Sequence, residues 1–224
     1  MTVKKLVLEA MGIFSRAQLN AQQDTAQGLQ AILNMVPGFT FLWHKTRESL
    51  QCTNCGAVTA NEVYNSFALV DIPDRSNTRP FSVTQCIQRH FTAAEAGIER
   101  LCVHCDGNVA TKSTTLPQAP HFIMVQLKRF AQSRAGRLYK IGTDAIPFSE
   151  LDIHTEEGPS TYEVVGSINH EGIEMSHGHY KAFIAHGSQW LLCDDQIITT
   201  IGSIENHPSQ PTQSAYVLML NLKN

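Results

Sequence analysis

The chain has 224 residues, and its 42% hydrophobic and 17% charged residues are ordinary for a soluble globular fold with a sizeable core. Its net charge of −3, from 20 acidic and 17 basic residues, gives no electrostatic basis for binding nucleic acid or an anionic membrane. We therefore expect neither as a partner.

The N-terminal stretch begins with two lysines and a short apolar run. Glu9 and Arg16 interrupt this run before it reaches the length of a signal-peptide core or a membrane span. We expect an intracellular protein, in the cytoplasm or the nucleus. In such a compartment, six cysteines favour metal binding over disulfides.

An amphipathic helix is predicted in the polar region that follows Ser15. Apolar residues recur there at helical spacing from Leu29 to Val36, and the Pro37-Gly38 pair supplies a stop signal. This helix is the only element that we predict before Trp43.

The chain changes pattern at Trp43, where short β-type runs begin and continue to about Thr115. One helix is predicted within this region, at SVTQCIQRHF. From Leu116 onward we predict strands separated by loops. These strands are HFIMVQLKRF, YEVVGSINH, GHYKAFIAH, QWLLCDD and SAYVLMLNL.

Two C-x-x-C pairs stand out, Cys52 with Cys55 and Cys102 with Cys105. Thiolates two residues apart can both reach one tetrahedral Zn²⁺, and two such pairs complete a four-sulfur structural site. Because 46 residues lie between the pairs, we expect them at the tips of separate β-hairpins that the metal joins. Two alternatives remain, in which His104 replaces a sulfur or the four cysteines bind no metal.

The segment GHYKAFIAHGSQWLLCDD predicts an antiparallel hairpin with a two-residue turn. A turn at His186-Gly187 sets His179 directly opposite Asp194. A turn at Gly187-Ser188 leaves Asp194 one diagonal step away on the same face of the sheet. In either register the histidine has a carboxylate partner, which is the arrangement that fixes the tautomer of a general base.

Neighbouring residues leave alternatives open at this hairpin. A bulge or a three-residue turn would bring Asp195 to His179 instead of Asp194. Strand alternation points Cys193 to the opposite face, so we expect a core cysteine there and no nucleophile. Gly178 would let the backbone approach a ligand closely. Exposed loop histidines are also common; we interpret His177 as one, and that interpretation stays open for His179.

Taken in order, these motifs resemble the ubiquitin-specific protease family of deubiquitinating cysteine proteases, peptidase family C19. QQDTAQGLQAIL is similar to its Gln-Gln-Asp helix, the two C-x-x-C pairs to its zinc-bearing fingers, and PHFIMVQLKRF to its LKRF strand. SHGHYKAFI is similar to its Gly-His-Tyr box, WLLCDDQIIT to the box that follows, and SAYVLML to its closing strand. The resemblance covers about residues 18–222.

The resemblance implies an α+β fold. Its parts would be a papain-like palm built on an antiparallel sheet, zinc-ribbon β fingers and a truncated helical thumb. We expect a single catalytic-type domain over residues 1–224, with a residual thumb helix in 1–42, the fingers in 43–115 and the palm in 116–224.

It also implies the roles of individual residues. His179 would be the general base and Asp194 would orient it, while Asp24, Gly178 and Tyr180 would bind the C-terminal tail of ubiquitin. The four paired cysteines would ligate a structural Zn²⁺. The reaction of the family is thiol-dependent hydrolysis of ubiquitin isopeptide bonds, so the expected partner is ubiquitin or a ubiquitinated protein.

The chain departs from the family pattern at its nucleophile. The family's box, Asn-Thr-Cys-aromatic preceded by glycine, should lie upstream of the Gln-Gln-Asp helix. Only 21 residues precede Gln22, and the first cysteine of the chain is Cys52. Within the helix, Gln27 and Gly28 stand where the family usually has glutamate and an aromatic residue.

Three hypotheses follow. In the first, the chain is the fingers and palm of a deubiquitinase whose nucleophile is supplied by a missing N-terminal segment or a partner chain. In the second, it is a catalytically inactive ubiquitin-binding or scaffold module. In the third, it is a zinc-stapled β-rich interaction domain unrelated to ubiquitin. Because attack on a carbonyl requires the thiolate, we expect the isolated chain not to cleave.

Overall fold

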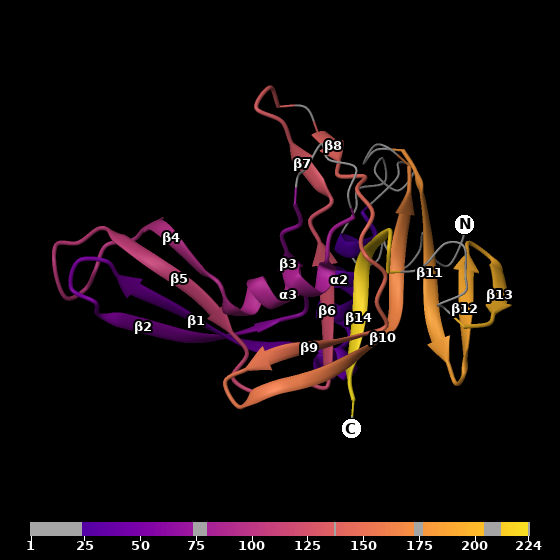
Figure 1. The fold of residues 1–224 in the computed structure, drawn as a ribbon, viewed down its shortest axis with the longest axis horizontal. Coiled ribbons are helices and arrows are strands. Elements are labelled where there is room, and N and C mark those ends of the chain that lie inside the picture. Colours follow the sequence, from indigo (N-terminus) through magenta and orange to yellow (C-terminus); the bar gives the residue numbers. More distant parts are fainter. Residues whose placement is uncertain (1–23, 74–79, 137, 173–176, 204–211, 224) are drawn as a thin grey trace.

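Two β-sheets of unequal size form most of the molecule, and the smaller sheet projects from one side of the larger (Figure 1). The structure is a computed structural model, and it describes residues 24–73, 80–136, 138–172, 177–203 and 212–223. In that part of the chain, every helix is too short or too polar to span a bilayer.

Among the described residues, the large sheet has eight strands in the order β13-β12-β11-β10-β14-β6-β3, with β9 paired to β10 beside this path. All of its pairs are antiparallel except β3 with β6. The prediction of an antiparallel sheet in the C-terminal half is therefore confirmed. The strands are β3 (Ala68–Val70), β6 (Phe122–Leu127), β9 (Glu150–Thr155), β10 (Gly158–Glu171), β11 (His179–His186), β12 (Gln189–Asp194), β13 (Ile197–Ile201) and β14 (Ala215–Leu222).

The small sheet has four antiparallel strands in the order β2-β1-β5-β4 within the described ranges. These are β1 (His44–Cys52), β2 (Val58–Asn65), β4 (Ala94–Glu99) and β5 (Val109–Thr115). The β1–β2 turn and the β4–β5 loop meet at the far tip of this arm (Figure 1). A further two-stranded hairpin, β7 (Phe130–Gln132) with β8 (Leu138–Lys140), stands above the large sheet.

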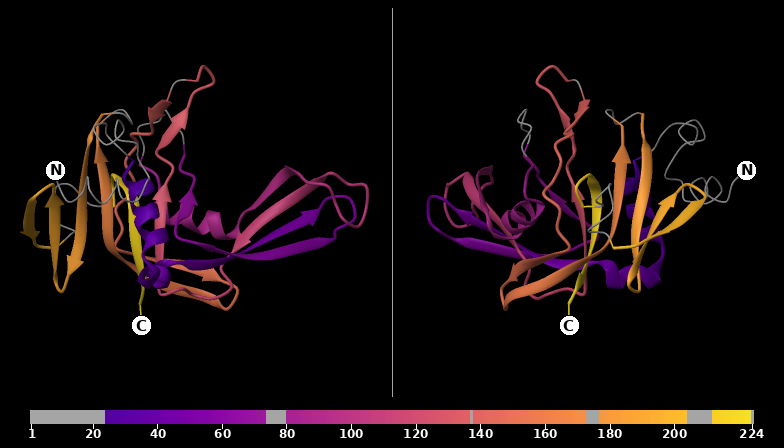
Figure 2. Two further views of the ribbon diagram at one scale, coloured as in Figure 1. Left: turned by 180° about the vertical axis from the view of Figure 1, so that it is seen from behind. Right: turned by 45° about the vertical axis from the view of Figure 1, so that its right-hand side comes forward.

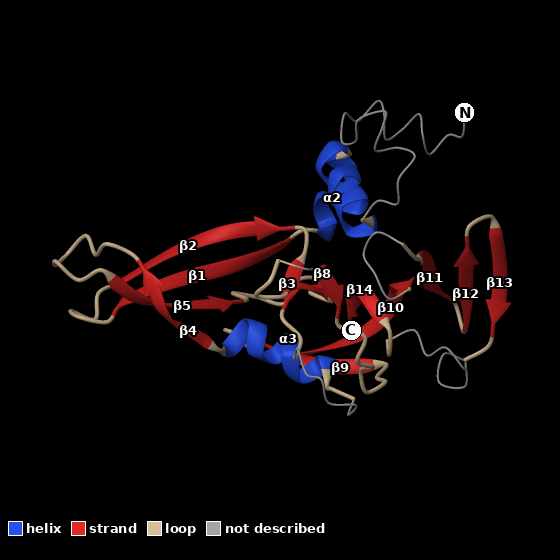
Figure 3. Cartoon of the chain, turned by 90° about the horizontal axis from the view of Figure 1, so that it is seen from above, coloured by secondary structure: helices blue, strands red, loops and turns tan. Residues whose placement is uncertain are grey.

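Two α-helices pack on opposite faces of the large sheet (Figure 3). Helix α2 (Thr25–Met35) begins at Asp24, whose side chain accepts a hydrogen bond from the backbone N–H of Ala26 at 2.7 Å. It ends before the 3₁₀ turn η2 (Pro37–Leu42), as the Pro-Gly stop signal predicts. Seen from behind, α2 lies across β14 and β6 (Figure 2). The predicted part of this helix before residue 24 lies outside the described residues.

Helix α3 (Val83–Thr92) matches the predicted SVTQCIQRHF helix and begins at Ser82, whose hydroxyl accepts from the N–H of Gln85 at 3.2 Å. Its buried residues recur every four positions: Val83, Ile87 and Phe91. They join the main core with residues of β3, β6, β9, β10 and β14. We expected the stretch 43–115 to form the fingers. Instead, its strand β3 joins the large sheet and its helix α3 packs against that sheet, while β1, β2, β4 and β5 form the small sheet.

A buried guanidinium fixes the junction between the large sheet and the β7–β8 hairpin. Arg129 is only 2% exposed, and its Nε donates to the carbonyl of Ala215 at 2.6 Å. Its two terminal nitrogens donate to the carbonyls of Ile141, Thr143 and Gln213 at 3.0–3.1 Å. Burial lowers the pKa of Arg129 to about 10, so the group stays charged at neutral pH.

We predict that Arg129→Met will lower the free energy of unfolding by at least ~3 kcal/mol, because four carbonyls lose a charged donor inside the fold. Urea denaturation measures the change. The neighbouring Lys128→Met is the control, since the ion pair of Lys128 with Asp71 is solvent-exposed and is expected to contribute less than about 1 kcal/mol. Equal losses in the two variants would contradict this account of Arg129.

Candidate functional site

The β11–β12 hairpin carries the predicted histidine and aspartate. Its turn is Gly187-Ser188, because His186 pairs with Gln189, and Gly187 has φ +60°, a conformation that glycine adopts readily. In this register Asp194 lies one diagonal step from His179 on the same face, which is one of the two predicted arrangements. The Nε2 atom of His179 is hydrogen-bonded to Oδ1 of Asp194.

The electrostatics of this pair define which nitrogen donates. The hydrogen bond from His179, and then the charge of Lys181, hold the pKa of Asp194 below its usual range, so its oxygens act as acceptors at neutral pH. Nε2 must therefore donate, and in a neutral imidazole with this tautomer Nδ1 carries the lone pair. The pair is partly open to solvent, with side chains 39% and 35% exposed.

Asp195, the alternative partner, belongs to the turn that follows β12. Its backbone is in the left-handed region at φ +52°, and its side chain is exposed. A carboxylate oxygen of Asp195 lies within 4.8 Å of the ligand atoms of His179 and Asp194, but the hydrogen bond to the ring belongs to Asp194.

Cys193 lies on the opposite face of β12 from Asp194, as strand alternation predicts. The expectation that this face is core is wrong. Cys193 is half-buried, and its cross-strand neighbour on β13, Ile198, is 66% exposed. The reason is that β12 and β13 lie at the margin of the sheet, beyond the faces that α2 and α3 cover.

Asp24 joins α2 to the large sheet. While Oδ1 caps the helix, Oδ2 accepts a hydrogen bond from the hydroxyl of Tyr216 at 2.7 Å, and that hydroxyl accepts one from Gln126, also at 2.7 Å. Tyr180 packs beside them, with its ring centroid 6.2 Å from that of Tyr216. Burial, and then the charge of Asp24, raise the pKa of Tyr180 to about 12.

Gly178 lies where the chain folds back on the end of β10, immediately before His179. A Cβ atom at this position would come closer than 3.0 Å to the ring of His170 and to the carbonyl of Glu171. Gly172 closes the same loop at φ +134°, a conformation that side chains rarely permit. The approach of backbone to backbone here therefore depends on the two glycines.

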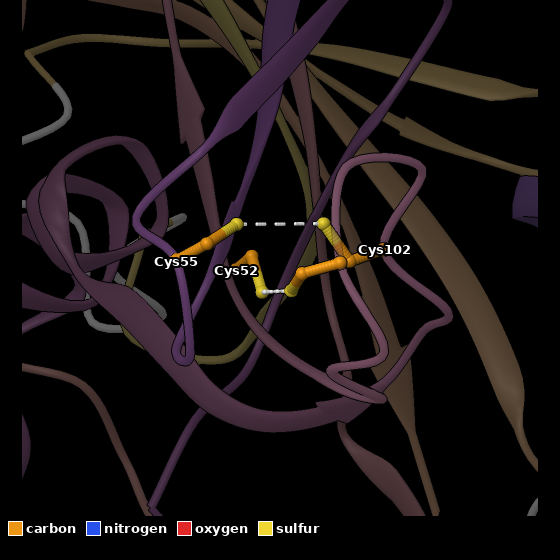
Figure 4. Close-up of side chains that lie close together, drawn as sticks. Cys52, Cys55 and Cys102 are labelled. Atoms are coloured by element: carbon orange, nitrogen blue, oxygen red, sulfur yellow. Dashed lines mark hydrogen bonds between the residues drawn. The ribbon is translucent and has the colours of Figure 1, made fainter.

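The four paired cysteines meet at the tip of the small sheet (Figure 4). Their sulfur atoms all lie within 4.8 Å of one another, and the pairs Cys52–Cys105 and Cys55–Cys102 are each 3.7 Å apart. A disulfide needs a separation of about 2.0 Å. Four sulfurs at ~2.3 Å from one tetrahedral zinc stand about 3.8 Å apart, so the observed spacing fits a metal. His104 is not a member of this cluster.

The cluster also has the donors that a thiolate site needs. The N–H of Gly107, at 3.3 Å, and then the amide of Asn54 lower the pKa of Cys105 to about 6, which favours the anionic ligand form. A Cβ on Gly107 would lie 3.0 Å from the sulfur of Cys52 and 3.2 Å from that of Cys105. Glycine at this position therefore keeps the space beside the sulfurs open.

Three polar side chains at the site were not found by sequence reasoning. Lys140 of β8 donates to the carbonyls of His170 and Gly172 at 2.5 and 2.8 Å, and so fixes the end of β10. Lys181 and Glu171 form an ion pair beside the histidine and aspartate. No motif marks them, but the period-2 register that paired β11 with β12 would have placed Lys181 directly across from Asp194.

A cavity of about 820 Å³ lies elsewhere, where the small sheet meets the large one. Its walls come from β1, β3, α3, β4 and β5, and include His44, Cys86 and His90. None of the residues predicted for the site lines it.

The antiparallel sheet, with few helices and a cysteine-tipped second sheet, defines a papain-like palm-and-fingers class of fold. Within that class, the chain belongs to the ubiquitin carboxyl-terminal hydrolase family, whose model matches residues 7–220. The hypothesis of an interaction domain unrelated to this family is therefore wrong.

Individual relatives agree with this assignment. The chain is 25% identical over 189 residues to ubiquitin carboxyl-terminal hydrolase 25 of Arabidopsis thaliana, covering 80% of this chain and 27% of that protein. It is 32% identical over 151 residues to ubiquitin carboxyl-terminal hydrolase 15 of Mus musculus, covering 62% and 15% respectively. The chain thus spans well under half the length of these two relatives.

Solved structures share the fold. The SAGA DUB module of Ubp8, Sgf11, Sus1 and Sgf73 bound to monoubiquitin matches with a TM-score of 0.71 and 21% identity, covering 93% of this chain and 51% of the matched chain. The same module bound to ubiquitin aldehyde matches with a TM-score of 0.69 and 20% identity, over 93% and 51%.

We predict that Gly178→Ala will lower the free energy of unfolding by ~1–3 kcal/mol, because the new methyl group overlaps His170 and the backbone of β10. Chemical denaturation tests this. The matched control is Gly28→Ala inside α2, where a Cβ meets nothing within 4 Å and where alanine should stabilise the helix by roughly 0.5–1 kcal/mol. If Gly178→Ala were as stable as wild type, the close packing of this loop would not matter.

Proposed function

We propose that residues 1–224 act as one ubiquitin-specific protease-type domain that recognises ubiquitin. It would supply the general base of a thiol-protease site, His179, and the aspartate that orients it, Asp194. The observation that carries this proposal is the hydrogen bond from Nε2 of His179 to Asp194, which leaves Nδ1 ready to accept a proton. The family assignment supports the proposed reaction, which is thiol-dependent hydrolysis of ubiquitin isopeptide bonds.

In this mechanism Nδ1 of His179 removes the proton of a cysteine thiol, and the thiolate attacks the carbonyl carbon of the C-terminal glycine of ubiquitin. The imidazolium then returns the proton to the departing lysine amine, which leaves as the isopeptide C–N bond breaks. Water hydrolyses the thioester by the same base. Asp194 keeps the ring in one tautomer and stabilises its charged form.

We propose that the sulfur comes from outside these 224 residues. Four of its six cysteines form the cluster at the tip of the small sheet, Cys86 belongs to α3, and Cys193 faces away from His179. We therefore propose that the base acts on a thiol from a further N-terminal segment or a partner chain, and that the isolated chain is inactive.

We propose that Asp24, Gly178 and Tyr180 bind the C-terminal tail of ubiquitin. Gly178 contributes exposed backbone immediately before His179, and Asp24 and Tyr180 lie together beside the N-terminus of α2. An extended Gly-Gly tail offers no side chains for recognition, so exposed backbone such as that of Gly178 can approach it closely.

The second candidate function is that of an inactive ubiquitin-binding or scaffold module. The observation in its favour is that, among the described residues, the ligand-type side chains grouped with His179 are Asp194 and Asp195 and no cysteine. The two functions differ in one respect: only the first requires that an added thiol restore turnover through His179.

We propose that Cys52, Cys55, Cys102 and Cys105 bind one structural Zn²⁺. The 3.7 Å separations and the donors around Cys105 support it. With four sulfur ligands no coordination position is open, so the metal would contribute to folding and not to catalysis.

Protein purified without added metal should contain about one zinc per chain. Cys102→Ser should lose the zinc and lower the melting temperature, because the two hairpin tips are then no longer joined. Metal analysis and thermal denaturation measure both effects, with Cys86→Ser of α3 as the control outside the cluster. Zinc-free protein of unchanged stability would contradict the proposal.

The isolated chain should bind ubiquitin weakly and should not react with an electrophilic ubiquitin C-terminal probe, because such probes trap a thiolate beside the bound tail. Mass spectrometry measures the adduct, and titration calorimetry measures binding. Asp24→Ala should weaken binding, whereas Asp152→Ala on β9 is the matched control.

An adduct on Cys86 or Cys193 would overturn the assignment of these two cysteines. Adding a segment that carries the family's cysteine box separates the two functions: turnover that His179→Ala abolishes identifies an enzyme, and persistent inactivity with intact binding identifies a module.

A further inference from the structure

Four charged or titratable side chains occupy one face of three neighbouring strands. In the register of β10 with β11, Glu171 lies directly opposite His179. In the register of β11 with β12, Ala182 pairs with Cys193, which sets Lys181 directly opposite Asp194. His179 is therefore flanked by two acids, Glu171 directly across on one side and Asp194 diagonally across on the other.

The acid that the His179 ring contacts is not the one directly opposite it. Side chains directly opposite in an antiparallel pair are closer than diagonal ones, so Glu171 is the better-placed acid for His179. Yet the hydrogen bond of the ring goes to Asp194. Glu171 instead accepts from the ammonium of Lys181 at 3.0 Å, and the same ammonium lies 3.4 Å from Oδ2 of Asp194.

We propose that Lys181, held by Glu171, is a positioning residue for the His179–Asp194 pair. Its ammonium binds Glu171, which would otherwise compete with Asp194 for His179. The same ammonium attracts Oδ2 of Asp194, so that Oδ1 faces the ring. This inference rests on the proposed function, since a fixed tautomer matters only where the histidine acts as a base. Lys181 itself touches no reacting atom.

Lys181 is the cation that lies beside Asp194 on the β11 side of β12. On the other side of β12, β13 presents Ile197 opposite Asp194, and none of its residues from Ile197 to Ile201 is titratable. Asp195 is exposed in the turn and adds only negative charge. The pKa of Asp194 is lowered first by the hydrogen bond of His179 and then by the charge of Lys181.

The test is a ¹³C NMR titration of the Asp194 carboxyl carbon in the full chain, which needs neither ubiquitin nor a nucleophile. In Lys181→Met the midpoint should move to higher pH, because the carboxylate loses a cation and Glu171 is free to compete for His179. In Glu171→Gln it should move to lower pH, because the ammonium then serves Asp194 alone. Lys181→Arg should stay near wild type.

Charge alone gives midpoint shifts of opposite sign in these two variants, so positioning is read from the ring itself. The ¹⁵N chemical shifts of His179 should show the Nε2–H tautomer in wild type and Lys181→Arg, and a mixture of tautomers in Lys181→Met, in variants that melt near the wild-type temperature. A fixed Nε2–H tautomer in Lys181→Met would overturn the inference. An unchanged midpoint in Lys181→Met, or shifts of one sign, would also overturn it. Glu171→Gln is nearly isosteric and decides the sign even where Lys181→Met fails to fold. The titration contains no ubiquitin. A chain that fails to bind ubiquitin would therefore contradict the proposed function without deciding this inference, and the reverse also holds.

Discussion

The buried guanidinium of Arg129 is the constraint on which both halves of the candidate site depend. It joins the β6–β7 junction to the start of β14 through Ala215 and to the loop that follows β8 through Ile141. Tyr216, next to Ala215, holds Asp24 and so docks α2. Lys140, next to Ile141, reaches the end of β10, where the chain turns back toward His179. A buried charge is costly, and here four carbonyl acceptors and the charge of Asp144 compensate for it.

Local periodicity was sufficient to predict the two α-helices and five strands of the C-terminal half, β6, β10, β11, β12 and β14, because each has a strong pattern. Strands β7, β8, β9 and β13 were not predicted. The His179–Asp194 contact was also predictable. A glycine-containing two-residue turn fixes the register of a hairpin, and the register fixes the face of every side chain. That the two distant cysteine pairs meet was predictable for a different reason, since a tetrahedral zinc site takes four sulfur ligands and each pair supplies two.

Other features depend on contacts that no local pattern records. The hydrogen bond from Tyr216 to Asp24 spans 192 residues. The stretch 43–115 looked like one β unit, but Val70 and Ile87 are fully buried in the core of the large sheet, and only the tertiary fold reveals this. Cys193 was wrongly assigned to the core because alternation identifies a face but not whether another element covers it.

The His179–Asp194 pair contributes little to stability, and this bears on the choice between an enzyme and an inactive module. Both side chains are more than a third exposed to water, and exposed ion pairs typically contribute ~0–1 kcal/mol. Stability alone therefore gives no reason for the arrangement in which the His179 ring is hydrogen-bonded to Asp194 while Lys181 pairs with Glu171. The hydrogen bond from Nε2 to Asp194 fixes the tautomer of the His179 ring, which a general base needs and an exposed ion pair does not.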